Sequence, residues 1–175
     1  MTRLRDIDPD TVAEQTHQAL LGRMWQIAQL CGVTDPVAPS TTPSEAYLTV
    51  QALARYATTG APPEGRLELV ETYLLRVGKV AHLLGDYVHL HRPTTALGVV
   101  MAAAHARSSL DHDSRITSAQ LAILASVTPG RIAQLQKAGD APTGELTTWE
   151  GRPDTRMIKA REARTWLSGR GVAGF

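Results

Sequence analysis

The chain has 175 residues, a formal net charge of +1 at pH 7 and 43% hydrophobic residues, a composition typical of a globular protein with a filled core. Aromatic residues make up only 5%, so Ala, Leu and Val carry the apolar content and favour closely packed helices over a β-sandwich. No run of about 18 apolar residues occurs, so no membrane-spanning helix is expected. The N-terminal residues also lack the apolar segment of a signal peptide.

The charge is unevenly distributed along the chain. Residues 1–113 carry a net charge of −3 and residues 114–175 a net charge of +4. This pattern is typical of a polyanion-binding module attached to a second region, although chance variation among solvated surfaces gives the same asymmetry. The single cysteine, Cys31, rules out an intrachain disulfide and fits a reducing cytoplasm, and we expect a buried thiol there.

Four helices are predicted in the N-terminal part. Asp8 and Pro9 mark the start of a helix that runs to about Cys31, and a second helix covers residues 44–59 and ends at Gly60. The first helix has an apolar stripe at helical spacing, formed by Val12, Thr16, Leu20, Met24, Ile27 and Cys31.

A long third helix is predicted over residues 64–90, with Gly78 and Gly85 in its interior at a close helix crossing. The fourth helix is expected to begin at the cap Thr94 and end near Leu110. Its surface of small side chains lets a helix approach closely, from the same chain or from a second copy.

Residues 116–139 predict two short helices joined by a tight turn. Thr117 and Gln120 have the spacing of a capping box. Thr128 is a suitable N-cap before Pro129, and Gly139 a suitable end. Small and apolar residues stand where a helix-turn-helix needs them, with Ala122 inside the first helix and an inward face formed by Val127, Ile132, Ala133 and Leu135.

The outer face of the second short helix would be presented to the major groove of DNA. This face consists of Thr128, Gly130, Arg131, Gln134 and Lys137. Arginine can pair with guanine and glutamine with adenine. An ordinary solvated helix face is the alternative interpretation.

Beyond Gly139 the helical pattern stops. Residues 145–149 and 156–159 predict two short strands around a turn at 150–155, with Leu146, Trp149 and Met157 on one apolar side. A last helix is predicted over residues 160–168.

Residues 116–171 resemble the winged helix-turn-helix of the excisionase and MerR-type DNA-binding families. The resemblance is carried by the helix pair, the exit Gly139-Asp140-Ala141-Pro142, the hairpin and the string Glu162-Ala163-Arg164-Thr165-Trp166-Leu167. It implies a recognition helix in the major groove and a wing at the DNA backbone or minor groove. The chain departs from the pattern at Ser126, which stands at the turn position that glycine usually occupies. The segment between Pro142 and Lys159 is also longer than in the shortest members of these families.

Further DNA contacts are expected from the wing and from the start of the first short helix. Arg152, Arg156 and Lys159 would contact phosphates from the wing, and Thr117 and Ser118 would contact a phosphate through hydroxyl and backbone N–H groups. Surface solubility and simple helix capping explain the same residues.

Histidines at five positions raise the question of a metal site: His82, His89, His91, His105 and His112. Their spacing does not match a zinc motif and no cysteine accompanies them. No phosphate loop, nucleophile elbow or paired-carboxylate motif occurs. We therefore expect no metal, no cofactor and no enzymatic activity.

Together these patterns predict a mainly α fold in two parts. Residues 1–110 would form a helical bundle for dimerisation or partner binding, and residues 116–175 a winged helix-turn-helix. The expected function is a sequence-specific, dimeric regulator of transcription that binds double-stranded DNA, from a prokaryote, phage or plasmid. A DNA-bending recombination factor, or a helical protein-interaction module such as an adaptor or antitoxin, is the alternative.

Overall fold

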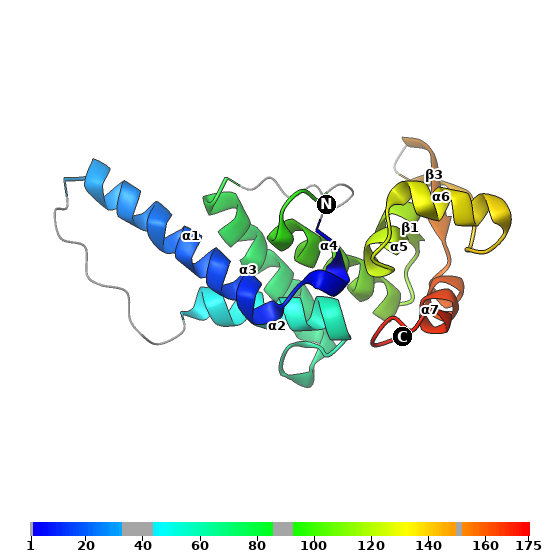
Figure 1. The fold of residues 1–175 in the computed structure, drawn as a ribbon, viewed down its shortest axis with the longest axis horizontal. Coiled ribbons are helices and arrows are strands. Elements are labelled where there is room, and N and C mark those ends of the chain that lie inside the picture. Colours follow the sequence, from blue (N-terminus) through cyan, green and yellow to red (C-terminus); the bar gives the residue numbers. More distant parts are fainter. Residues whose placement is uncertain (1, 33–43, 86–92, 150–151) are drawn as a thin grey trace.

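A computed structural model describes residues 2–32, 44–85, 93–149 and 152–175. For residues 147–149 and 152–155 it describes the backbone alone. Within these ranges the chain is mainly helical, with one small three-stranded antiparallel sheet. The helices form an elongated body, with α1 (Pro9–Leu30) at one end of the long axis and α6 (Pro129–Ala138) at the other (Figure 1). None of the described helices has the length and apolarity needed to cross a membrane.

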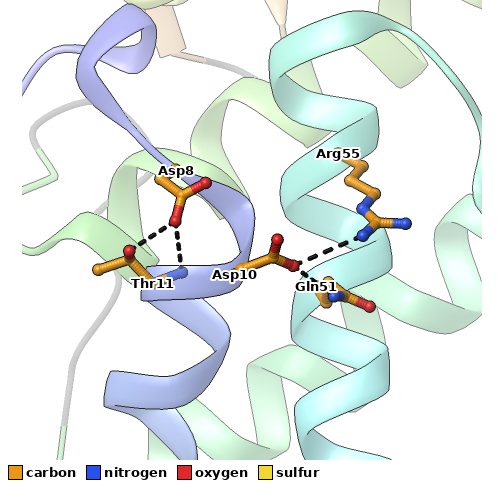
Figure 2. A network of polar contacts seen from close by, with 5 residues as sticks. All are labelled: Asp8, Asp10, Thr11, Gln51 and Arg55. Atoms are coloured by element: carbon orange, nitrogen blue, oxygen red, sulfur yellow. Dashed lines mark hydrogen bonds and ion pairs between the residues drawn. The ribbon is translucent and has the colours of Figure 1, made fainter.

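Helix α1 (Pro9–Leu30) follows a short 3-10 turn, η1 (Leu4–Asp6), and begins where predicted. The Asp8 carboxylate accepts hydrogen bonds from the backbone N–H and the hydroxyl of Thr11, at 2.8 and 2.5 Å (Figure 2). The side chain of Asp10 contacts Gln51 and Arg55 on the neighbouring helix α2 (Glu45–Thr59). The first turn of α1 is therefore both capped and fixed against α2.

The two ends of α1 differ in burial. Near the N-terminus, Val12, Ala13 and Thr16 are buried. The other end projects beyond the body (Figure 1) and exposes four large apolar side chains: Met24, Trp25, Ile27 and Leu30. The predicted stripe is thus buried over its first half only. The expectation that Cys31 is buried is wrong, because Cys31 lies at this projecting end and is exposed.

The predicted helix over residues 64–90 is interrupted at its start and is shorter than expected. Glu64 and Gly65 have φ of +52° and +70°, a left-handed backbone that an α-helix cannot contain. They belong to a 3-10 turn, η2 (Pro63–Gly65), and a second turn, η3 (Leu67–Leu69), leads into α3 (Val70–Leu83). Gly85, with φ of +73°, lies just beyond the end of α3 and not inside a helix; residues 86–92 lie outside the described chain.

Helix α4 (Ala96–Asp111) forms the centre of the molecule. Its N-cap is Thr95, one residue later than predicted, and the Thr95 hydroxyl accepts from the backbone N–H of Gly98 at 3.0 Å. The small side chains on α4 pack against α2 and α3, and against α5 (Ser118–Leu124) and α7 (Ala160–Gly169) of the same chain. At the crossing with α3, a side-chain carbon on Gly78 would lie 3.6 Å from the end of the Met101 side chain, which is an ordinary van der Waals distance, so this crossing does not require glycine.

The C-terminal part has the element order β1 (Ile116–Thr117), α5 (Ser118–Leu124), α6 (Pro129–Ala138), β2 (Glu145–Trp149), β3 (Arg152–Ile158) and α7 (Ala160–Gly169). Strand β3 is central in the sheet and pairs with both β1 and β2. The sequence did not predict β1, and it predicted β3 four residues too short at its start. Ile116 and Ile158 pair across β1 and β3 and are fully buried, which joins the sheet to the core.

A buried arginine ties the end of the chain to the helical body. The Arg107 side chain, on α4, is 1% exposed. Its guanidinium donates to the carbonyl oxygen of Ala57 at 2.9 Å and to that of Ala173 at 2.5 Å, and it lies 4.4 Å from the centre of the Phe175 ring. Burial lowers the pKa of this guanidinium. The C-terminal tail is thus packed onto α2 and α4 through one side chain.

Candidate nucleic-acid interface

Helix α5 begins with the predicted capping box. The Thr117 hydroxyl accepts from the backbone N–H of Gln120 at 3.2 Å, and the Gln120 side chain accepts from the backbone N–H of Thr117 at 2.8 Å. Ser118, the first residue of the helix, accepts a hydrogen bond from the Gln136 side chain at 2.9 Å. The Thr117 hydroxyl therefore caps α5, and the Ser118 hydroxyl joins α5 to α6.

The turn between α5 and α6 has a left-handed residue at the predicted position. Ser126 has φ of +54°, a conformation that glycine adopts more readily than serine. The backbone N–H of Val127 donates to the carbonyl oxygen of Ala122 at 3.0 Å and closes the turn. The Ser126 hydroxyl also accepts from the backbone N–H of Arg5 at 3.0 Å, so the N-terminal segment contacts this turn directly.

Helix α6 begins and ends where the sequence predicted. The Thr128 hydroxyl accepts from the backbone N–H of Arg131 at 3.2 Å, Pro129 is the first helical residue, and Gly139 ends the helix with φ of +81°. Ile132 and Leu135 are buried, as expected for the inner face. The expectation that Ala133 also faces inward is wrong, because Ala133 is exposed.

The opposite face of α6 is open to solvent. All five residues expected on it are exposed: Thr128, Gly130, Arg131, Gln134 and Lys137. Arg131 donates to the Gln134 side-chain oxygen at 3.4 Å, a long and weak hydrogen bond. Neither Arg131 nor Lys137 forms an ion pair with any residue in the described ranges. Within the described part of the chain, the face therefore carries two positive charges that have no carboxylate partner.

The strands β2 and β3 form the predicted hairpin with a different distribution of apolar side chains. Leu146 pairs with Arg156, whereas Met157 pairs with Glu145. Because residues directly opposite each other share a face of the sheet, Leu146 and Met157 lie on different faces. The predicted common apolar side is therefore wrong, and Leu146 is 61% exposed. Arg156 is also exposed; the side chains of Arg152 and Trp149 lie outside the described ones.

Lys159 already has a partner at the base of the hairpin. Its ammonium lies 2.6 Å from the Glu145 carboxylate, and Arg115 lies 3.5 Å from the same group. The hydrogen bond between Lys159 and Glu145 raises the pKa of Lys159 and lowers that of Glu145. Two cations thus share one carboxylate, and Lys159 is less available to an external phosphate than Arg156.

Helix α7 packs against the core and contacts the segment that follows α6. Its inner residues Ala163 and Leu167 are buried. The Trp166 indole N–H donates to the carbonyl oxygen of Asp140 at 2.6 Å, just after α6, and Arg164 donates to the carbonyl oxygen of Leu110 at 3.0 Å, at the end of α4. These contacts join α7 to the end of α6 and to the central helix α4.

The sequence did not identify a cleft beside the N-terminus of α6. Its walls come from the N-terminal segment, the α5–α6 turn and the residues after α7, and it has a volume of about 670 Å³. Four arginines contribute to the lining: Arg3, Arg5, Arg131 and Arg170. Residues this far apart in the chain give no sequence signal, since only the fold brings them together.

No cluster of metal-ligating side chains is found among the described residues; His89 and His91 lie outside them. Comparisons with models of protein families, with curated proteins and with solved structures gave no match.

Proposed function

We propose that the protein is a sequence-specific DNA-binding protein and that α5, α6 and the β2–β3 hairpin act as a winged helix-turn-helix. The observation that carries this proposal is the outer face of α6, which is exposed, positively charged and free of ion pairs within the described chain. The caps at both ends fix the length of α6, and the left-handed backbone of Ser126 fixes the turn that orients α6 relative to α5.

The residues on this face suit base recognition in the major groove. Arg131 can donate two hydrogen bonds to guanine, and Gln134 can pair with both edge atoms of adenine. Their mutual hydrogen bond of 3.4 Å is weak enough to be exchanged for bases. Lys137 and Arg156 would contact phosphates, which adds affinity and little sequence information.

A second copy of the chain would supply the rest of the specificity, since one short helix reads only a few base pairs. The exposed apolar end of α1, formed by Met24, Trp25, Ile27 and Leu30, is the surface that we assign to dimerisation. This end and α6 lie at opposite ends of the long axis (Figure 1). Because one turn of the DNA helix separates equivalent groove positions, a symmetric dimer would bind half-sites about 34 Å apart, or a multiple of that spacing. We place this binding in transcriptional regulation in the cytoplasm.

The test is selection of duplexes by the purified full chain from a pool of random sequence. The expected result is an inverted repeat bound at about 0.1 M salt with at least 1,000-fold preference over random DNA. Enrichment of no motif, with binding indistinguishable from that of random duplexes, would contradict a sequence-specific regulator.

The exposed end of α1 also favours a second candidate, a protein-interaction module whose N-terminal helices bind another protein. This function predicts a stoichiometric complex that survives nuclease treatment and is lost when the apolar end of α1 is changed. Selection of an inverted repeat by the chain alone would argue against it.

A further inference from the structure

The cleft beside the N-terminus of α6 concentrates positive charge from three separate parts of the chain. Arg3 and Arg5 come from the N-terminal segment, Arg131 from the first turns of α6, and Arg170 from the end of α7. Among the residues that the structure describes, no aspartate or glutamate lines the cleft. Four arginines that line one hollow raise the positive potential around it, and a positive potential favours the binding of an anion.

The arginines of the N-terminal segment are held on a fixed backbone. Leu4 and Ile7, which flank Arg5, are 4% and 8% exposed and belong to the core. The backbone N–H of Arg5 is bound to the Ser126 hydroxyl at 3.0 Å. The segment is thus attached to the turn that precedes α6, and its charged side chains stay beside that helix.

The present partners of these arginines can be exchanged. Arg5 lies 3.6 Å from Asp6, a pair in which both side chains are about 60% exposed, and such surface pairs contribute little. Arg170 lies 4.8 Å from the centre of the Trp166 ring, and a guanidinium that stacks on an aromatic ring keeps its edge available for hydrogen bonds.

The cleft is continuous with the outer face of α6, because Thr128 and Arg131 belong to both. When the first turns of a recognition helix meet base edges, the sugar-phosphate strand bordering the major groove passes beside the helix N-terminus. The partial positive charge of that terminus favours a phosphate at the same place.

We propose that this cleft binds the phosphodiester backbone of the duplex that α6 enters, with Arg3, Arg5 and Arg170 as phosphate-contacting residues. The assignment rests on the proposed function. It adds a contact made by the N-terminal segment, outside the part of the chain that resembles a winged helix-turn-helix. Phosphate contacts in the cleft add binding affinity and fix the position of the protein along the DNA, and they do not discriminate between bases.

The experiment measures the binding constant of the full chain for the selected duplex as a function of salt concentration. The variant is Arg3→Gln/Arg5→Gln, and the matched control is Arg23→Gln/Lys79→Gln, which removes the same charge from exposed positions on α1 and α3. Each lost phosphate contact lowers the slope of log K against log salt by about 0.9. We expect the variant slope to fall by roughly 2, with affinity about 10- to 100-fold weaker near 0.1 M salt and the selected motif unchanged.

The outcomes separate the two proposals. Suppose that the wild type binds the selected duplex specifically, so that the proposed function stands. The cleft is then not a phosphate site if the Arg3→Gln/Arg5→Gln variant keeps the wild-type salt slope, or if the control variant loses as much slope as this variant does. A variant that selects a different motif would also overturn the assignment, since phosphate contacts carry no base preference. If the wild type binds no duplex specifically, the proposed function fails and the cleft assignment fails with it.

Discussion

Side-chain caps fix the helix starts at the candidate interface. Thr117 and Thr128 each accept a hydrogen bond from the backbone N–H three residues later. The cap at Thr128 also determines where the exposed face of α6 begins. Replacing a threonine at such a position by alanine leaves a backbone N–H without its partner.

We therefore expect Thr128→Ala to lower the free energy of unfolding by about 1 kcal/mol. Urea denaturation of the full chain measures this loss, and Thr143→Ala, at an exposed loop position, is the matched control. Equal stability of the two variants would contradict a capping role for Thr128.

Tyr56 links α2 to the end of α4. Its ring is fully buried, and its hydroxyl donates to the Asp111 carboxylate at 2.5 Å. Burial, and then this hydrogen bond, raise the pKa of Tyr56 well above its ordinary value near 10. In the unfolded chain the phenol ionises near pH 10, while in the folded chain it stays protonated, so folding stability falls as the pH rises above that value.

Tyr56→Phe removes this source of alkaline destabilisation. We expect the free energy of unfolding of the variant to fall less steeply than that of the wild type above about pH 10. Part of the fall remains, because the pKa of Tyr73 is also raised, by burial and by its hydrogen bond to Glu64. Parallel pH profiles for the wild type and the Tyr56→Phe variant would show that Tyr56 does not carry the effect; Tyr47→Phe is the control.

Among the features of the helices and strands, the sequence predicted best those that depend on contacts between residues close together in the chain. The N-caps Asp8, Thr117 and Thr128 were identified because their hydrogen bonds reach only three residues along the chain. The left-handed turn at Ser126 was expected from the family resemblance and is present.

Features that depend on distant contacts were not predictable. The apolar stripe of α1 was correctly located, but only its first half is covered by the body of the molecule. The periodicity of the stripe does not show where this cover ends. The position of Leu146 depends on the pairing register of β2 and β3, which is shifted between Thr147 and Trp149. Likewise, the position of Arg5 next to Ser126, 121 residues later in the chain, is set by the fold alone.

The projecting end of α1 allows the proposed dimer to be tested. We expect Ile27→Glu/Leu30→Glu to convert a dimer into a monomer, because two carboxylates cannot be buried in an apolar interface without partners. Both positions are exposed in the chain, so the fold should persist. Sedimentation equilibrium measures the change, with Leu146→Glu on the hairpin as the exposed control. A dimer that persists in the α1 variant would place the interface elsewhere.

For the whole molecule, α4 connects the parts that the sequence suggested as separate. It packs against α2 and α3 on the N-terminal side and against α5 and α7 on the C-terminal side, and most of the buried apolar residues form one cluster from Leu4 to Leu167. A continuous core thus connects α6 with the buried first half of α1, from which the proposed dimerisation surface projects.

The most direct test is the binding of the selected duplex by Arg131→Ala and Gln134→Ala variants in a gel shift at fixed salt. We expect each substitution to weaken specific binding by about 1–3 kcal/mol and to relax the base preference at one position of each half-site, while Arg23→Gln, on α1, binds as the wild type does. Unchanged affinity and unchanged base preference in both α6 variants would contradict the assignment of this helix to base recognition.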